Sequence, residues 1–407
     1  MNGCRARSAG LLLLLLLLAT PCSAAKQLRE PAELLLGMST ALSGPLAEIG
    51  VELRRGVLAG LERANRSGGI HGRRLHLIVL DDGYEPARAA PNVQRLLDEF
   101  QVQALIGNVG TPTAIASIPI ARDRRTLFFA PFSGAGVLRR DPPDRYVINY
   151  RASYAEEIEA MVDALIDIGG LRPEEIAFFT QRDSYGDAGY VGGFQALKKH
   201  GLKNELSILH VRYQRNTMAV ENALADILMS DPLPRAVIMV GAYAPCAKFI
   251  RLARESGLHS LFLNVSFVGS ESLAAALPTA TAGVLVTQVV PDPFTSKLPL
   301  VLDYRTDLER LEPGSRPSSV SLEGYISARI LLLALAGSGP PINRERIIDR
   351  LEKLGRFDLG LGEPLHLSPN HHQASHRVWP TRLEKRRFIP FDWRQIKRLL
   401  PDEEESR

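Results

Sequence analysis

The chain has 407 residues, of which 45% are hydrophobic and 23% charged, as in a soluble globular protein long enough for two domains. Its formal net charge is +4, but the basic residues are spread along the sequence and only two tryptophans are present. The sequence has no basic patch interleaved with aromatic residues, which argues against nucleic-acid binding, and the basic run at 382–387 is interpreted as an exposed turn.

Residues 1–25 have the parts of a secretory signal peptide. Two arginines precede an apolar run at 11–20, and a stretch of small residues follows it. The run is too short to span a bilayer comfortably, so we expect the protein to be exported, with a mature chain that begins near Lys26. Lipid anchoring at Cys22 is a less favoured alternative, because Pro21 fits that signal poorly.

Cysteine use excludes a disulfide framework. Of the three cysteines, Cys4 and Cys22 lie in or next to the signal peptide, and only Cys246 remains in the mature chain. Stability must therefore come from core burial rather than cross-links. We interpret Cys246 as a small core residue with no catalytic role.

The first part of the mature chain alternates short apolar runs with longer segments of helical periodicity. Strands are expected at 34–40, 74–82, 102–108 and 126–131, and helices at 45–65, 87–100 and 112–122. This order of elements calls for a parallel sheet with helices on both faces.

The same rhythm restarts at residue 145. Strands are expected at 145–150, 175–181, 205–213, 235–241, 260–266 and 283–293, and helices at 154–169, 186–200, 219–229 and 245–256. Further helices are expected at 297–311, 319–336 and 343–354, followed by a short β-rich tail to Trp393. The sequence thus predicts an α/β protein with two Rossmann-like lobes, each a parallel sheet with helices on both faces.

The expected lobe boundaries follow from this rhythm. Lobe 1 takes residues 32–150 and 285–365, and lobe 2 takes residues 151–284 and 366–393. The acidic end, 394–407, is expected to be disordered.

Two similar α/β lobes in one exported chain suggest a cleft that closes on a ligand. In open α/β sheets, ligands bind outside the carboxyl ends of strands. The polar and aromatic residues expected at such strand ends are Thr111, Thr113, Phe132, Ser133, Gly134, Tyr154, Tyr185, Tyr243, Ser266 and Phe267. Hydroxyls, backbone N–H groups and aromatic walls suit a small ligand with one polar end and an apolar body.

These residues also have ordinary structural interpretations. The threonines on either side of Pro112 would only cap a helix, and Ser133 with the following glycine would only form a turn. Tyr185 and Tyr243 would be packing aromatics. Their positions at corresponding strand ends in both lobes favour a role in ligand binding over these structural roles.

The sequence offers little support for catalysis. It has no Gly-x-Ser-x-Gly elbow, no phosphate-binding glycine loop and no cysteine pair for a metal. The His371-His372 pair lies in a Pro/Asn loop with no carboxylate at metal spacing, so we interpret it as a surface feature. The Asp81-Asp82 pair ends a strand and is interpreted as a local cap. We therefore expect no enzymatic activity, no metal and no cofactor.

Five segments together carry a family resemblance: SGPLAEIG (43–50), RSGGIHGRRLHLIVLDDGYEP (66–86), ALIGNVGTPT (104–113), SYGDAGY (184–190) and GVLVTQVVP (283–291). They resemble the type I periplasmic solute-binding proteins of the leucine/isoleucine/valine-binding family, over roughly residues 33 to 393. The resemblance implies two lobes joined by a hinge, in a periplasmic receptor that captures a small organic ligand. It also implies transient docking to a membrane ABC permease, no chemistry, and a monomer.

The resemblance places the family's ligand contacts on Thr111, on residues 132–134, and on Tyr185, Tyr243 and Ser266. Amino-acid binders of the family have a hydroxyl where this chain has Gly134. They have carboxylates for the ligand ammonium where this chain has Tyr154 and Ser266. An ammonium enclosed without a carboxylate is costly, so we expect a ligand other than an ordinary α-amino acid.

Arg151 and the aromatic residues suggest which ligand would replace an α-amino acid. Arg151 would pair with a ligand carboxylate or, alternatively, form a salt bridge at the hinge. An aromatic or larger apolar body would be walled by Phe132, Tyr154, Tyr185, Tyr243 and Phe267. Besides an importer component, the sequence leaves open a carrier of a bulky lipid or sterol-like ligand and a sensory module. An exported α/β hydrolase is less favoured, since no nucleophile–base–acid set can be assembled.

Overall fold

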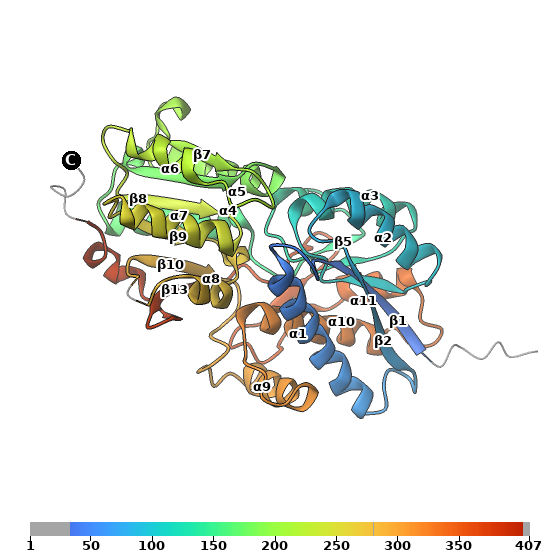
Figure 1. Ribbon diagram of the computed structural model, residues 1–407. Coiled ribbons are helices and arrows are strands. Elements are labelled where there is room, and N and C mark those ends of the chain that lie inside the picture. The colour runs from blue at the N-terminus through green and yellow to red at the C-terminus, as the bar shows by residue number, and fades with distance from the viewer. Residues whose placement is uncertain (1–32, 280, 402–407) are drawn as a thin grey trace, which may run out of the picture. The chain divides into compact units, whose positions relative to one another are not determined.

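The computed structural model describes residues 33–279 and 281–401, which belong to one compact unit beginning at Ala32 (Figure 1). The expected signal peptide, 1–25, and Cys22 lie outside the described residues. The described part is built on two sheets, and lobe 1 and lobe 2 are named here after the first and the second.

The sheet of lobe 1 has five parallel strands in the order β2-β1-β3-β4-β5. The strands are β1 (Glu33–Thr40), β2 (Arg74–Asp81), β3 (Ala104–Ile106), β4 (Phe128–Phe129) and β5 (Val147–Ile148). Its central strand β3 is buried along its whole length, because helices cover both faces of the sheet.

The helices of lobe 1 are α1 (Ala47–Arg66), α2 (Pro86–Asp98), α3 (Thr111–Asp123), α9 (Pro299–Leu311), α10 (Ser319–Gly337) and α11 (Arg344–Glu352). Helices α1, α10 and α11 share one core with the sheet, and α2 and α3 share the core of the opposite face. A small hairpin of β11 (Gly355–Phe357) and β12 (Leu365–Leu367) adds Leu365 and Leu367 to the first of these cores.

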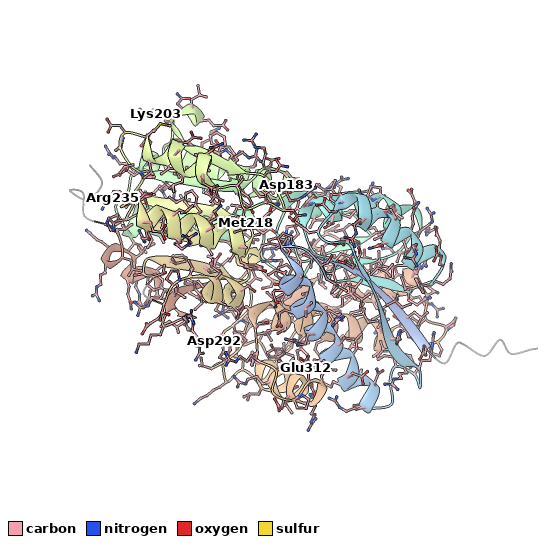
Figure 2. All side chains as sticks on the ribbon, in the orientation of Figure 1. Asp183, Lys203, Met218, Arg235, Asp292 and Glu312 are labelled. Carbon is pink, nitrogen blue, oxygen red and sulfur yellow. The ribbon has the colours of Figure 1, made fainter. Side chains whose placement is uncertain are left out.

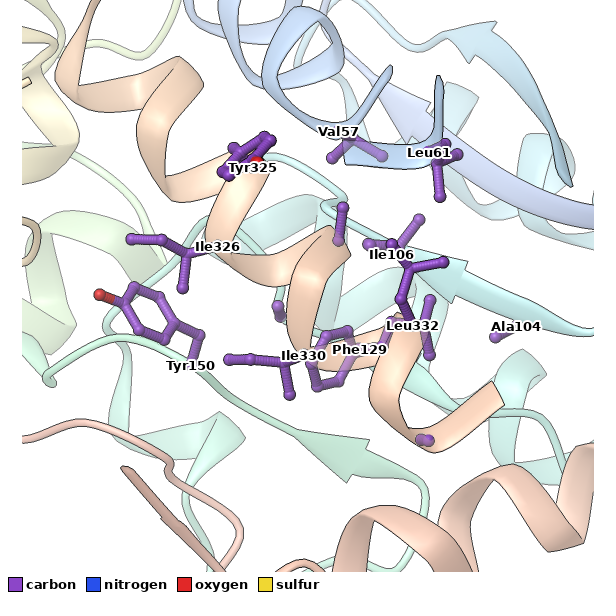
Figure 3. Close-up of a cluster of buried hydrophobic side chains, with 14 of the residues drawn as sticks. Val57, Leu61, Ala104, Ile106, Phe129, Tyr150, Tyr325, Ile326, Ile330 and Leu332 are labelled. Atoms are coloured by element: carbon purple, nitrogen blue, oxygen red, sulfur yellow. The ribbon is translucent and has the colours of Figure 1, made fainter. Parts of the chain in front are cut away.

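Helices α1 and α10 touch backbone to backbone. A Cβ placed on Gly56 would lie 1.7 Å from the carbonyl oxygen of Ser321, so only glycine fits at this crossing. Figure 3 shows the side chains packed around this pair, with labels on Val57, Leu61, Ala104, Ile106, Phe129, Tyr150, Tyr325, Ile326, Ile330 and Leu332.

Within the described residues, α10 is the one helix long and apolar enough to cross a membrane. Most of it is buried against α1 and the sheet, and it carries Glu323 and Arg329. These features are those of the core helix of a folded lobe.

The sheet of lobe 2 has seven strands in the order β14-β13-β10-β9-β8-β6-β7. They are β6 (Ile176–Gln181), β7 (His210–Tyr213), β8 (Ala236–Val240), β9 (Leu261–Asn264), β10 (Val284–Gln288), β13 (Trp379–Glu384) and β14 (Arg387–Pro390). Strands β6 to β10 are parallel, and β13 and β14 extend the edge in antiparallel fashion.

The helices of lobe 2 are α4 (Tyr154–Asp163), α5 (Ser184–Lys199), α6 (Glu221–Leu228), α7 (Tyr243–Glu255) and α8 (Ser270–Ala276). Two of them begin with strong caps. Ser153 and Glu156 form a reciprocal capping box at the start of α4, and Asp183, labelled in Figure 2, accepts a bond from the backbone N–H of Tyr185 at 3.0 Å.

Some expected elements differ from the structure. The strand expected at 205–213 is a 3-10 helix at Glu205–Ser207 followed by the shorter β7. The helix expected at 154–169 is α4 continued by one π-helical turn, Ala164–Ile168. The tail expected to be disordered from 394 includes a 3-10 helix at Trp393–Arg398, because buried Ile396 anchors it in the core of lobe 2.

The lobe boundaries also lie elsewhere than expected. Strand β10 belongs wholly to the second sheet, although the expected boundary placed residue 285 in lobe 1. At the other end, the chain stays with the core of lobe 1 through Ala374, although residues from 366 were expected in lobe 2. Apolar periodicity marks a strand but does not say which sheet it joins.

Candidate functional site

The two sheets each have a topological switch point where candidate residues gather. In lobe 1 the chain passes from β1 to β2 on one side and then to β3 on the other side of β1, and Thr111 follows β3. In lobe 2 the corresponding strands are β6 and β8, followed by Tyr185 and Tyr243. Crevices at such points are the usual ligand sites of open α/β sheets.

Four candidate aromatic residues from both lobes pack against one another and are called the aromatic cluster: Phe132, Tyr154, Tyr185 and Phe267. Phe267 lies at its centre, with ring centroids 4.5 Å from Tyr185 and 5.5 Å from Phe132. All four side chains are buried. The cluster therefore joins the loop after β4 in lobe 1 to α4, α5 and the turn after β9 in lobe 2.

Arg151 lies beside the aromatic cluster and is 1% exposed. Its guanidinium carbon is 4.7 Å from the ring centroid of Phe132 and 5.9 Å from that of Tyr154. Its Nη2 atom donates a short hydrogen bond to the hydroxyl of Ser266. These contacts fix a buried cation at an aromatic wall.

Two buried carboxylates face this cation. Glu157 Oε1 lies 3.5 Å from Arg151 Nη2, and Glu323 Oε1 lies 3.7 Å from Arg151 Nε. Glu157 also accepts bonds from the Ser266 N–H at 2.7 Å and from the Thr287 hydroxyl at 2.6 Å. The expected hinge salt bridge of Arg151 is thus present within the candidate site itself.

The electrostatics of this group are unusual. Burial raises the pKa of Glu323 to about 7, with the Arg151 charge opposing and the Glu157 charge adding to the rise. Burial also raises the pKa of Glu157, against the Arg151 charge and several hydrogen bonds. Burial lowers the pKa of Arg151, but Glu323 and Glu157 outweigh it and hold that pKa above the usual value.

Three hydrogen-bond donors at the site are buried. The Nε and Nη1 atoms of Arg151 and the hydroxyl of Tyr154 have no hydrogen-bond partner at normal distance in the described part of the chain. Burial raises the pKa of Tyr154, and the Arg151 charge and the contacts with Gly134 and Ser133 oppose the rise. Because buried polar atoms are rarely left unbonded, these three point to a site for a ligand's acceptor atoms.

Thr111 and Thr113 have different surroundings. The hydroxyls of Thr111 and Ser133 are 2.7 Å apart and lie at the lobe 1 side of the site. Thr113 donates to the backbone carbonyls of Val109 and Gly110, as a residue in the first turn of a helix often does. Thr113 therefore has the structural role of satisfying backbone groups at the start of the helix, as in its alternative interpretation from the sequence.

Gly134 lies directly beneath Tyr154. A Cβ at this position would be 2.5 Å from Tyr154 Cδ1 and 2.7 Å from its backbone nitrogen. The Tyr154 ring therefore packs so closely on position 134 that it leaves no room there for a side chain with a hydroxyl.

Tyr243 lies apart from the aromatic cluster, at a groove of about 760 Å³ between the lobes. The groove is bounded by the start of α1, including Glu48 and Ile49, and by α8 and the start of α10. Ile49, which lines the groove, belongs to the same core as Phe132 and Phe267.

Further contacts join the lobes around the site. The ring of Tyr84 is 6.1 Å from Phe267, and its hydroxyl accepts a bond from Gln181 Nε2 at 3.2 Å. At the rim, Arg215 Nη2 lies 2.9 Å from Glu85 Oε2. The lobes therefore meet across a continuous core and hold the candidate residues in a closed arrangement.

Sequence reasoning missed three residues of the site: Tyr84, Glu157 and Glu323. Glu323 could have been found from the sequence, because a carboxylate in an otherwise apolar helical segment needs a buried partner. Glu157 resembled an ordinary first-turn acid of α4, and Tyr84 resembled a turn residue.

A family model for periplasmic binding proteins matches residues 33–387. The chain belongs to the periplasmic binding protein family. It is similar to the amino acid binding protein of Pseudomonas aeruginosa, with 24% identity over 313 residues that cover 76% of this chain and 79% of the relative. The crystal structure of a possible leucine/isoleucine/valine-binding protein from Rhodopirellula baltica SH 1 has 52% identity and a TM-score of 0.86, covering 89% of this chain and 97% of that chain.

The fold is also shared with a fatty acid ABC transporter substrate-binding protein from Thermomonospora curvata. That structure has 19% identity and a TM-score of 0.78 over 92% of this chain and 93% of its own. These findings confirm the predicted type I periplasmic binding protein fold and the leucine/isoleucine/valine-binding family. Proteins of this family are periplasmic solute-binding components of ABC transporters and are not enzymes, as the sequence predicted.

Proposed function

We propose that this periplasmic binding protein captures a small organic ligand between its lobes and delivers it, as a monomer, to a membrane ABC permease. The ligand has an oxygen acceptor at one end, as a carbonyl or carboxylate does, and an aromatic or branched apolar body. The observation that carries this proposal concerns Nε and Nη1 of Arg151. These two nitrogens lie beside the aromatic cluster and have no hydrogen-bond partner among the described residues. Within this proposal, residues 1–25 direct export, and the mature chain is soluble rather than anchored at Cys22.

The charges around Arg151 argue against an ordinary α-amino acid. Glu157 and Glu323 supply the carboxylates whose absence the sequence suggested, but both face the guanidinium at 3.5 and 3.7 Å. A ligand ammonium that used them would lie beside a buried cation, and like charges about 4 Å apart repel by roughly 4 kcal/mol at the effective dielectric of a protein. A ligand carboxylate at Arg151 requires Glu323 to be protonated, which its raised pKa of about 7 permits. The site therefore favours a ligand that brings an acceptor oxygen and no ammonium group.

A second candidate ligand is a longer carboxylate, such as a fatty acid. The solved fatty-acid-binding neighbour shares the fold, and the groove beside Tyr243 has apolar members in Ile49, Val320 and Phe388. In this reading the carboxylate meets Arg151 and the chain extends along the groove. The broader alternatives of a lipid carrier or a sensory module differ only in the partner that receives the ligand.

A ligand screen tests the proposal. The mature chain from Lys26 is followed by thermal shift with branched amino acids, aromatic and short aliphatic carboxylates, amides, and fatty acids. A ligand at 100 times its dissociation constant should add about 2.7 kcal/mol to the free energy of unfolding. Stabilisation by leucine, with no response to any carboxylate or amide, would contradict the proposed ligand class.

Arg151→Met then tests the site. It should abolish the ligand-induced shift, and its loss of intrinsic stability is measured separately without ligand. Arg394→Met is the matched control, because Arg394 is exposed and, among residues 33–279 and 281–401, forms its ion pair with Asp392. A full ligand response in Arg151→Met would place the ligand elsewhere.

A further inference from the structure

A histidine cluster lies where the chain passes from lobe 1 to lobe 2 between β12 and β13. Its members are His366, His371 and His376, and the site described above uses none of them. The ring of His371 lies between the other two, with centroids 5.1 Å from His366 and 5.0 Å from His376. The segment that carries them is held to the earlier interlobe passage by Ala374 N–H, which donates to Asn149 O at 3.0 Å.

Two imidazole nitrogens of this cluster face each other. The Nε2 atoms of His371 and His376 are 2.9 Å apart. His376 is 52% exposed in its side chain and His371 is half-buried, so solvent reaches the pair.

Glu156 fixes the orientation of one ring. Its Oε1 atom lies 2.5 Å from His376 Nδ1, and Gln373 and Ser153 bind its other oxygen. Gln373 Nε2 also lies 2.9 Å from His376 Nδ1. A carboxylate accepts from Nδ1–H, and neutral His376 then presents the lone pair of Nε2 to His371.

The contact between the two Nε2 atoms has two chemical explanations. One ring can donate its Nε2–H to the other, or both rings can present lone pairs to a shared cation.

The separation suits a metal ion. Imidazole nitrogens bind zinc at about 2.0–2.1 Å, so two such ligands are about 2.9 Å apart at a right angle and about 3.4 Å apart at the tetrahedral angle. A carboxylate on the far nitrogen of a histidine ligand is the arrangement that commonly orients metal-bound imidazole. Glu156, which the sequence places far from the histidines, supplies that carboxylate.

We propose that Nε2 of His371 and Nε2 of His376 bind one divalent transition-metal ion, such as Zn²⁺, Ni²⁺ or Cu²⁺. Water completes the coordination, and Glu156 orients His376. The bound ion would tie the β12–β13 passage to the start of α4, next to the hinge. Under this proposal His371 is a metal ligand rather than only a surface residue, and the carboxylate that supports the site comes from a distant part of the chain.

Another metal-ligating group among the described residues is Asp163, Asp167 and His200. His200 Nε2 already lies 2.8 Å from Asp163 Oδ1, and both carboxylates are largely exposed, so the three form an ordinary hydrogen-bonded surface group. They provide a control for metal binding elsewhere on the surface.

The test uses the mature chain without a histidine tag, treated with chelator and titrated calorimetrically with ZnCl₂, NiCl₂ or CuCl₂ at pH 7.5. We expect one equivalent to bind with micromolar affinity, weakened at least tenfold in both His371→Gln and His376→Gln. His200→Gln should bind as the parent does. Electron paramagnetic resonance of the Cu²⁺ form should show coupling to imidazole nitrogen that both variants reduce.

Three results would overturn the proposal. The first is no binding at millimolar metal, which would leave a shared proton between the rings. The second is unchanged affinity in both cluster variants. The third is loss of binding in His200→Gln alone, which would assign the ion to the Asp163 group.

Discussion

The buried carboxylate of Glu323 should make the protein less stable as the pH rises from 5 to 8. Its pKa is about 7 in the folded protein, against 4.5 as the ordinary value for an unfolded chain. A group whose pKa is higher in the folded protein than in the unfolded chain makes its full contribution to the stability of the fold below the unfolded-chain value. That contribution is lost as the pH rises through the pKa of the group in the folded protein. The two pKa values differ by about 2.5, and at about 1.4 kcal/mol for each pKa unit this amounts to about 3.5 kcal/mol.

Glu323→Gln removes this titration while keeping the size of the side chain. Above pH 7 the variant should be more stable than the parent by about 2–3 kcal/mol, and near pH 4 the two should be nearly equal. Arg151 keeps Glu157 as its partner in the variant. Urea unfolding at pH 4, 5, 6, 7 and 8 measures the difference between the two proteins, in which other titrating groups cancel.

Glu174→Gln is the matched control, because Glu174 is exposed, and it should leave the pH dependence unchanged. Parallel stability curves for Glu323→Gln and the parent would refute the reasoning. They would mean that the folded protein does not hold Glu323 in a medium that disfavours its charge.

Three other changes have expected outcomes. Gly134→Ser should lower the free energy of unfolding by about 1–3 kcal/mol in urea, because its Cβ would meet the Tyr154 ring, and a stable variant would contradict the tight packing. Thr111→Val should cost about 0.5–1.5 kcal/mol in the same assay, since the buried Ser133 hydroxyl loses its 2.7 Å bond to Thr111 and keeps the longer one that it accepts from the Ala135 N–H at 3.3 Å, and no loss would show that the bond contributes nothing. Cys246 is buried, and burial raises the pKa of its thiol, so a thiol reagent should label it only in denaturant; rapid labelling of the native protein would disprove its burial.

Much of the fold could be predicted from local pattern. Alternating apolar and periodic segments gave the strand and helix order, because each element leaves its own period in the sequence. The 205–213 segment failed, because its apolar residues suggested one strand while residues 205–207 turn as a 3-10 helix. Sheet membership of β10 could not be read at all, since pairing depends on partners distant in the chain.

The candidate site, like the fold, could be predicted only in part. Tyr185 and Phe267 were found because strand ends of parallel sheets mark their place. Glu157 and Glu323 were missed because their importance comes from a single guanidinium that three-dimensional packing brings to them. The carboxylate on His376 was missed for the same reason, since Glu156 lies 220 positions away in the chain.

The contact between Gly134 and Tyr154 has a consequence for how such a receptor changes its ligand over evolution or in the laboratory. A hydroxyl at 134 cannot be added while the ring at 154 stays in place, and a smaller residue at 154 alone opens a cavity above the glycine. Each single step toward an amino-acid-type pocket therefore passes through a less stable protein. Libraries that vary positions 134 and 154 together should recover new binders that one-position scans of either residue miss.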